Sequence, residues 1–88
     1  MIERTVAIKN RSGLHTRPAA TLVKTAARFT SEFYIKKDSF EINGKSIIGV
    51  MTLAAEQGST LLLSFSGSDE AEMADAVCLL FDDGFGEL

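Results

Sequence analysis

The sequence predicts an α+β domain in which helices pack on one face of a mainly antiparallel sheet. Apolar residues switch along the chain between a period of two and a helical period, which gives the order β-α-β-β-α-β-α. Such a mixture of few strands and helices is typical of a two-layer sandwich. A chain of 88 residues, 45% of them hydrophobic and 24% charged, is large enough for one modest core. We therefore expect a single domain over residues 1–88.

Residues 2–9 form the first predicted strand, because apolar side chains alternate onto one face at Ile2, Val6 and Ile8. Residues 10–13 have the composition of a turn. A helix is predicted from residue 15 or 16 to about residue 29, with an apolar stripe at Ala19, Leu22, Val23 and Ala26. Pro18 fits only the first turn of this helix, where its missing N–H costs nothing.

Two short strands at residues 33–36 and 40–42 follow, since their apolar residues alternate on either side of the turn residues Asp38-Ser39. Ser46 is a suitable N-cap for a short helix over residues 47–55. This reading of the chain predicts a hairpin next to a one- or two-turn helix.

The last strand and helix complete the order. Residues 60–66 alternate as a strand, and Gln57-Gly58 before them is expected to end the preceding helix. The final helix begins near Asp69, which resembles a capping box with Glu72, and Gly84 is a plausible stop.

Charge is segregated along the chain. The first 45 residues hold all nine Lys and Arg and four acids, a net charge of +5, whereas residues 46–88 carry eight acids and no base. The total of -3 argues against nucleic-acid or anionic-membrane binding. No apolar run could span a bilayer, and no signal-peptide core is seen. The lone Cys78 offers neither a disulfide nor a metal site. We expect a cytoplasmic domain without metal or cofactor.

His15 is the only histidine, and it stands where a helix begins. The free N–H groups and positive dipole of a helix start favour an anion there, and Arg17 adds a forked donor suited to phosphate oxygens. Cationic surroundings would keep the imidazole neutral and nucleophilic near pH 7. A transient phosphohistidine requires this combination. The residues leave one alternative open, an N-cap histidine beside a solvated arginine.

Two motifs resemble a known family. Gly13-Leu14-His15-Thr16-Arg17-Pro18-Ala19-Ala20 is similar to the active-site signature of HPr, the histidine-containing phosphocarrier proteins of the bacterial phosphotransferase system. Gly44-Lys45-Ser46-Ile47-Ile48-Gly49-Val50-Met51 resembles the family's second signature, around a regulatory serine. The likeness extends over the whole chain in length and element order. It implies an open-faced β-sandwich, in which a four-stranded antiparallel sheet is covered on one face by three helices.

The resemblance implies a role for each matching residue. His15 would accept a phosphoryl group on Nδ1 from phosphorylated enzyme I, which takes it from phosphoenolpyruvate, and would pass it to an enzyme IIA for sugar uptake. Arg17 would stabilise the phosphate, with Ser12, Thr16 and backbone N–H groups nearby. Ser46 would be the target of HPr kinase/phosphorylase, whereas the residues alone favour a simple N-cap.

The resemblance also implies a partner surface. One short helix cannot bury all its apolar residues, so part of the set Ile47, Ile48 and Met51 must face solvent and can dock a partner. In the family this patch and the first helix meet enzyme I and enzyme IIA. The helix residues concerned here are Ala20, Lys24, Ala27 and Arg28. A transcriptional regulator is a further partner to consider, and the chain is expected to be a monomer.

The basic residues are expected to form a local positive face around His15, made by Arg17, Lys24, Arg28 and Lys45. The acidic half would lie mostly on the last helix and tail, away from His15. This arrangement would explain the segregated charge as a polarised docking surface.

Other classes of protein fit the sequence less well. An RNA-recognition module shares the element order but needs basic and aromatic residues together on its central strands. An acyl carrier would place its serine at a helix start and would contain no strands. A structural domain leaves residues 13–18 unexplained. Within the phosphocarriers, the nitrogen-related paralogue stays open, because its C-terminal end resembles residues 80–87.

Overall fold

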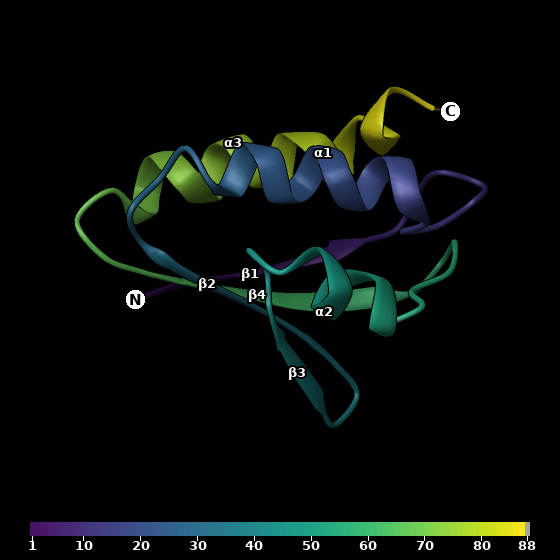
Figure 1. Cartoon of the computed structure of the whole chain (residues 1–88), viewed down its shortest axis with the longest axis horizontal. Coiled ribbons are helices and arrows are strands. Elements are labelled where there is room, and N and C mark those ends of the chain that lie inside the picture. Colours follow the sequence, from purple (N-terminus) through teal and green to yellow (C-terminus); the bar gives the residue numbers. More distant parts are fainter. Residues whose placement is uncertain (88) are drawn as a thin grey trace.

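The computed structural model describes residues 1–87, and its order of elements over that range is the predicted β-α-β-β-α-β-α (Figure 1). The predicted domain boundary at Leu88 lies one position outside the described residues. The elements are β1 (Ile2–Ala7), α1 (Thr16–Ala26), β2 (Glu32–Lys37), β3 (Phe40–Asn43), α2 (Ile47–Thr52), β4 (Thr60–Ser66), α3 (Glu70–Asp82) and the short 3-10 turn η1 (Gly84–Gly86).

The strands form one antiparallel sheet in the order β1-β4-β2-β3. The central strand β4 pairs with β1 from Ile2 opposite Phe65 to Ala7 opposite Thr60, and it pairs with β2 on its other side. Helices α1 and α3 run side by side over one face of the sheet, and α2 contacts α1 and β3 (Figure 1). The predicted open-faced β-sandwich is confirmed.

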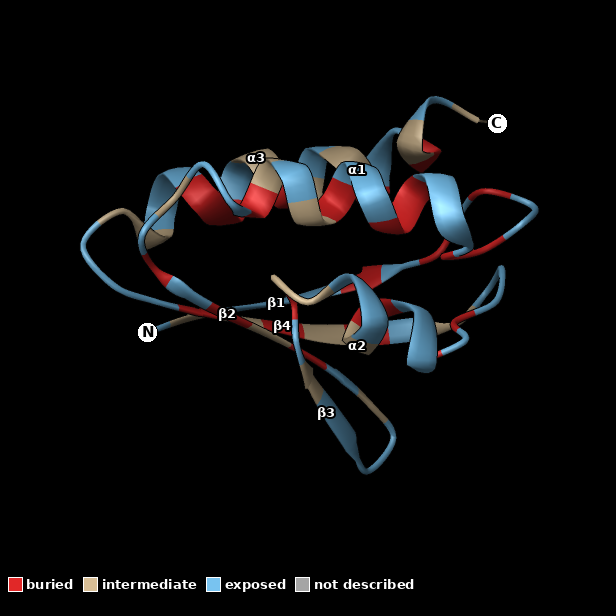
Figure 2. Cartoon of the chain, in the orientation of Figure 1, coloured by how far each residue is buried: buried red, intermediate tan, exposed pale blue. Residues whose placement is uncertain are grey.

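The core lies between the sheet and the helices, because the strands alternate and the helices carry apolar stripes. Figure 2 shows the buried side of α1 and α3 turned toward the sheet. The Phe33 and Phe65 rings stack at 4.8 Å between centroids. Full burial of such a side chain contributes roughly 1.5–3 kcal/mol. The predicted core residues that are buried include Val6, Ile8, Ala19, Leu22, Ala26, Leu61, Leu63, Phe65, Ala74, Val77 and Phe81.

Several predicted boundaries are too long, each for a local reason. The first helix ends at Ala26 and not near residue 29, and β1 ends at Ala7. Helix α2 ends at Thr52, because Ala54 adopts φ 49°, which a right-handed helix cannot contain. The expected helix stop at Gly58 is instead a turn whose N–H donates to the Ile8 carbonyl oxygen at 2.9 Å.

The predicted capping box at the start of α3 is wrong. Asp69 is the N-cap residue, but its side chain makes no capping hydrogen bond. Its carboxylate accepts hydrogen bonds from the backbone N–H groups of Thr30 and Ser31, each at 2.9 Å, and from the Ser31 hydroxyl. The Asp69 carboxylate thus accepts from the loop before β2, and for this reason it does not cap the first N–H groups of α3. Glu70, not Glu72, reaches back to a backbone N–H, that of Gly67 at 3.1 Å.

We expect Asp69 to make folding sensitive to acid. The Ser31 hydroxyl and the backbone N–H groups lower the pKa of Asp69 from 3.8 to about 2. A depressed folded-state pKa means that this stabilisation is complete above about pH 4 and is lost as the pH falls toward 2. The thermal unfolding midpoint of the wild type should therefore fall between about pH 4 and pH 2. In Asp69→Asn this fall should be smaller, because the variant has no carboxylate at residue 69 to protonate. Glu72→Gln on the same turn is the control and should keep the wild-type profile; identical profiles for all three proteins would contradict the assignment.

Candidate functional site

His15 is held at the N-cap of α1 by the loop before it. Gly13 takes φ 70°, the Leu14 N–H donates to the Ala55 carbonyl oxygen at 2.9 Å, and the Leu14 side chain is buried. The backbone of His15 is extended, with φ -79° and ψ -169°, and its side chain makes no capping hydrogen bond. The imidazole is 44% exposed and available for chemistry. The predicted helix start and the first-turn position of Pro18 are both confirmed.

The start of α1 provides hydrogen-bond donors beside His15. The first helical bond of the turn runs from the Ala19 N–H to the His15 carbonyl oxygen at 2.9 Å. The N–H groups of Thr16 and Arg17 precede that bond, so they have no acceptor within the helix. The first turn contains no acidic residue. These features favour an anion at the helix start, next to the imidazole.

Two concavities meet at His15. The larger, of about 460 Å³, is lined along α1 by His15, Thr16, Arg17, Ala20, Thr21, Lys24 and Thr25. The smaller, of about 240 Å³, is lined by Ser12, Leu14, His15, Thr16, Met51 and residues 54–56. The structure therefore gathers predicted site residues from three segments of the chain around one imidazole.

Helix α2 presents the expected apolar patch. Ile48 is 75% exposed, Met51 44% and Ile47 39%, whereas Val50 is fully buried. Met51 lines the smaller concavity with His15, so the patch borders the site. The prediction that part of this helix faces solvent is confirmed.

The predicted positive face is smaller than expected. Arg17 and Lys24 share the larger concavity with His15. Ala27 and Arg28 follow the end of α1, roughly 18–20 Å along the helix from His15 at 1.5 Å per residue. Arg28 lies over the Phe29 ring, 5.5 Å from its centroid, and the Lys45 ammonium donates to the Phe29 carbonyl oxygen at 2.7 Å. Of the four expected bases, Arg17 and Lys24 are therefore the ones beside His15.

The expectation that the acidic half lies away from His15 is wrong at Glu87. Its Oε1 lies 3.1 Å from His15 Nε2 and accepts a second hydrogen bond, also 3.1 Å, from Asn10 Nδ2. The hydrogen bond with His15 is the main cause that lowers the pKa of Glu87, and burial opposes it. Sequence reasoning missed this carboxylate, since it is separated from His15 by 72 positions. The closely spaced Gly84 and Gly86 were the available signal, because they let the tail turn back.

Ser46 is the N-cap of α2, as predicted. Its hydroxyl oxygen accepts a hydrogen bond from the Gly49 N–H at 3.1 Å, and the residue is half-buried. The Val50 N–H donates to its carbonyl oxygen at 2.9 Å. The Ser46 hydroxyl therefore stabilises the start of α2.

We expect Ser46→Ala to lower the free energy of unfolding by about 1 kcal/mol, because the first turn of a six-residue helix loses its side-chain acceptor. Chemical denaturation measures this change. Ser68→Ala, an exposed serine outside the helices, is the matched control and should be close to neutral. Equal stabilities of wild type and Ser46→Ala would show that the cap contributes nothing.

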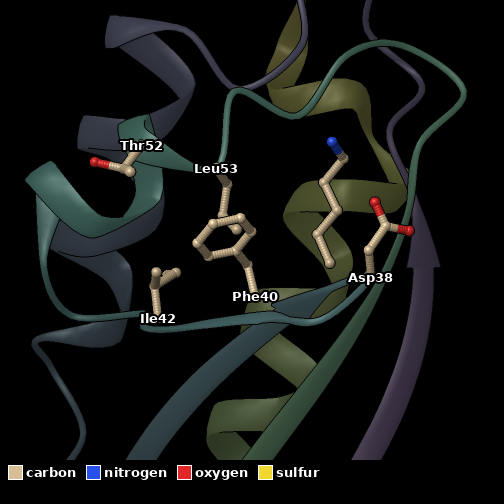
Figure 3. A pocket seen from close by; sticks show the side chains of 6 residues that line it. Asp38, Phe40, Ile42, Thr52 and Leu53 are labelled. Atoms are coloured by element: carbon tan, nitrogen blue, oxygen red, sulfur yellow. The ribbon is translucent and has the colours of Figure 1, made fainter.

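The described residues also bear on a metal site, a membrane span and a separate pocket. Residues 1–87 contain no cluster of three or more His, Cys, Asp or Glu that could hold a metal ion. Within the same range, no helix is long and apolar enough to cross a membrane. A separate hollow of about 230 Å³ lies on the hairpin side of α2, where Phe40, Ile42 and Leu53 form an apolar lining with Asp38 nearby (Figure 3). His15 does not line this hollow.

Comparisons with known proteins agree on one family. The family model for the PTS HPr component phosphorylation site matches residues 2–83. Phosphocarrier protein HPr of Treponema pallidum is 44% identical over 99% of both chains. The HPr-like protein Crh of Halalkalibacterium halodurans is 48% identical over 88% of this chain and 92% of its own.

A solved structure gives the same result. HPr-C-His from Thermoanaerobacter tengcongensis superposes with a TM-score of 0.96 at 45% identity, covering 100% of this chain and 99% of that chain. A second crystal structure from that organism is of an HPr dimer, with a TM-score of 0.80 at 46% identity and coverage of 99% and 100%.

Proposed function

The chain belongs to the HPr family of the phosphotransferase system, and from this premise we propose that it carries a phosphoryl group on His15. It accepts the group from phosphorylated enzyme I, which takes it from phosphoenolpyruvate, and passes it to an enzyme IIA for sugar uptake. The observation that carries the proposal is the half-exposed imidazole at the N-terminus of α1, with Arg17 in the same concavity.

The site supports this chemistry in a simple way. The Nδ1 lone pair of His15 forms a bond to phosphorus while the bond from phosphorus to the donor breaks. Arg17 and the first N–H groups of α1, which have no acceptor within the helix, would face the phosphoryl oxygens, and the helix dipole favours their negative charge. Ser12 and Thr16 lie on the rim of the site and add hydroxyl groups. Because α1 holds its first N–H groups in place before the donor arrives, these donors need little reorganisation at the moment of transfer.

The partner surface in this proposal surrounds His15. The exposed residues Ile47, Ile48 and Met51 supply apolar contact, and Lys24 supplies charge that steers acidic partners. The small exposed residues Ala20 and Ala27 allow close approach along α1, with Arg28 at the far end. Enzyme I and enzyme IIA would use this face in turn.

Ser46 is proposed as a regulatory phosphorylation site for HPr kinase/phosphorylase. A phosphate here adds about -1.5 to -2 charge at a helix start, which tolerates it without unfolding. Repulsion of an acidic partner from the adjacent α2 patch would then slow transfer from enzyme I. Incubation with this kinase and ATP tests the idea, and an unmodified Ser46 would leave it as a cap.

The proposal includes a cellular setting. We expect one HPr-like domain over residues 1–88 that acts as a monomer in the bacterial cytoplasm, with a transcriptional regulator as a further partner. Gel filtration tests the monomer, since the HPr from Thermoanaerobacter tengcongensis has been crystallised as a dimer. The nitrogen-related carrier is the alternative role, and it would be distinguished by the enzyme IIA that takes the phosphoryl group.

The decisive experiment is incubation with phosphoenolpyruvate and enzyme I. The product should carry one phosphate that is labile in acid and stable in alkali, as expected for a phosphohistidine. A chain that takes no label from an enzyme I active on another HPr would contradict the proposal.

A further inference from the structure

We infer that Glu87 is a positioning residue for His15, one that holds the proton on Nε2 and so leaves the Nδ1 lone pair free to accept the phosphoryl group. This inference rests on the proposed function for its role in transfer. The contact itself is a property of the free protein and can be measured without any partner.

The geometry supports a specific tautomer. Glu87 Oε1 lies 3.1 Å from Nε2, within the range of a normal hydrogen bond. An ionised carboxylate can only accept hydrogen bonds, so the imidazole must be the donor at this nitrogen. A neutral imidazole carries one N–H, and a proton held on Nε2 leaves Nδ1 unprotonated. The lowered pKa of Glu87 means that its carboxylate is ionised at neutral pH.

The carboxylate is held in place by a separate anchor. Asn10 is fully buried, and its Nδ2 donates both to Glu87 Oε1 at 3.1 Å and to the Gly13 carbonyl oxygen at 2.8 Å. One side chain thus ties the tail to the loop that carries His15. The Glu87 side chain is only 16% exposed, which limits its freedom to swing away.

The backbone brings the tail to this position by an unusual path. Gly84, Phe85 and Gly86 all take left-handed conformations, with φ of 60°, 56° and 73°. Phe85 carries a Cβ, which makes a positive φ unfavourable, so its backbone conformation costs on the order of 1 kcal/mol. Its ring packs edge-on against Phe81 with 5.0 Å between centroids, which offsets that cost. These three left-handed residues turn the chain so that Glu87 lies beside His15.

Charged side chains from several segments surround the contact between His15 and Glu87. Arg17 lowers the pKa of Glu87 through its charge, so it favours the ionised carboxylate. Lys9 and Arg11 line a hollow with Glu87, but the Lys9 ammonium lies 3.9 Å from the Asp82 carboxylate. Glu56 lines the smaller concavity together with His15.

In the transfer step, the Nδ1 lone pair forms the bond to phosphorus. The bond from phosphorus to the donor atom of enzyme I breaks, and its electron pair stays with that atom. The proton on Nε2 does not move, so the ring becomes more positive as the new bond forms. The carboxylate of Glu87 faces that growing charge, as an acidic residue does behind the histidine of a hydrolase triad.

The test measures the ring nitrogens directly. In protein labelled with ¹⁵N-histidine, the two nitrogen shifts at a pH where the imidazole is neutral report which nitrogen carries the proton. We expect Nε2–H to dominate in the wild type, and the Nδ1–H share to rise in Glu87→Ala, with a change of about tenfold in the tautomer ratio. Glu72→Ala removes the same charge from the far end of α3 and should match the wild type.

A kinetic measurement connects the contact to transfer. Phosphoryl acceptance by Glu87→Ala should slow about tenfold in kcat, with KM for enzyme I and the thermal unfolding midpoint close to wild type. A tautomer ratio unchanged by Glu87→Ala would overturn the inference, and so would an unchanged rate. If the ratio shifts but the wild type accepts no phosphoryl group, the proposed function fails while the positioning contact stands.

Discussion

Replacement of His15 by alanine should abolish phosphoryl acceptance. The imidazole is the proposed nucleophile, and no other histidine exists in the sequence to replace it. The fold should survive, because the side chain is 44% exposed and makes no capping bond to α1. We therefore expect label from phosphoenolpyruvate to fall to background in His15→Ala, while its thermal unfolding midpoint stays near that of the wild type.

Arg17→Ala provides a graded comparison. Arg17 would contribute a charge-assisted hydrogen bond to the phosphoryl oxygens, worth about 1.5–3 kcal/mol. Its loss should slow acceptance roughly ten- to hundredfold without abolishing it. If His15→Ala were labelled as fast as Arg17→Ala, the phosphoryl group would lie on another residue. That result would contradict the proposed function.

The parts of this molecule that the sequence predicted well are those with local causes. The strand Thr60–Ser66 follows from alternation, and the start of α1 follows from Pro18. The Ser46 cap follows from its position before a short apolar run. In each case the interacting groups lie within a few positions of one another, so spacing alone carries the information.

The parts that the sequence did not predict depend on tertiary contacts. Glu87 reaches His15 across 72 positions, and Asp69 reaches Ser31 across 38. Local pattern suggested a helix cap for Asp69, and segregated charge suggested a remote tail. Both expectations failed because the hydrogen-bond donors of these carboxylates come from segments that are distant in sequence and close only in the folded chain.

The second large effect is expected at Gly13, which shapes the loop that carries His15. Gly13 has φ 70°, and a Cβ there would overlap the Ala55 carbonyl oxygen and lie 3.1 Å from the Glu56 Cα. That backbone cannot withdraw easily, since the same Ala55 oxygen accepts from the Leu14 N–H. Left-handed strain of about 1–2 kcal/mol and a steric penalty of about 1–3 kcal/mol then add together. We expect Gly13→Ala to lose about 3 kcal/mol or more in the free energy of unfolding, measured by chemical denaturation.

Gly58→Ala separates the two causes. Gly58 also has a positive φ, 89°, but an added Cβ would meet no atom within 4 Å. Its substitution should cost only the backbone strain, about 1–2 kcal/mol. If both variants lost the same stability, the close approach to Ala55 would not matter.

If Gly13→Ala relieves its clash by moving the loop, Leu14 leaves its buried site and carries His15 away from the start of α1. Phosphoryl acceptance by the folded fraction of Gly13→Ala should then fall, whereas Gly58→Ala should transfer at the wild-type rate, because positive φ alone does not move the imidazole.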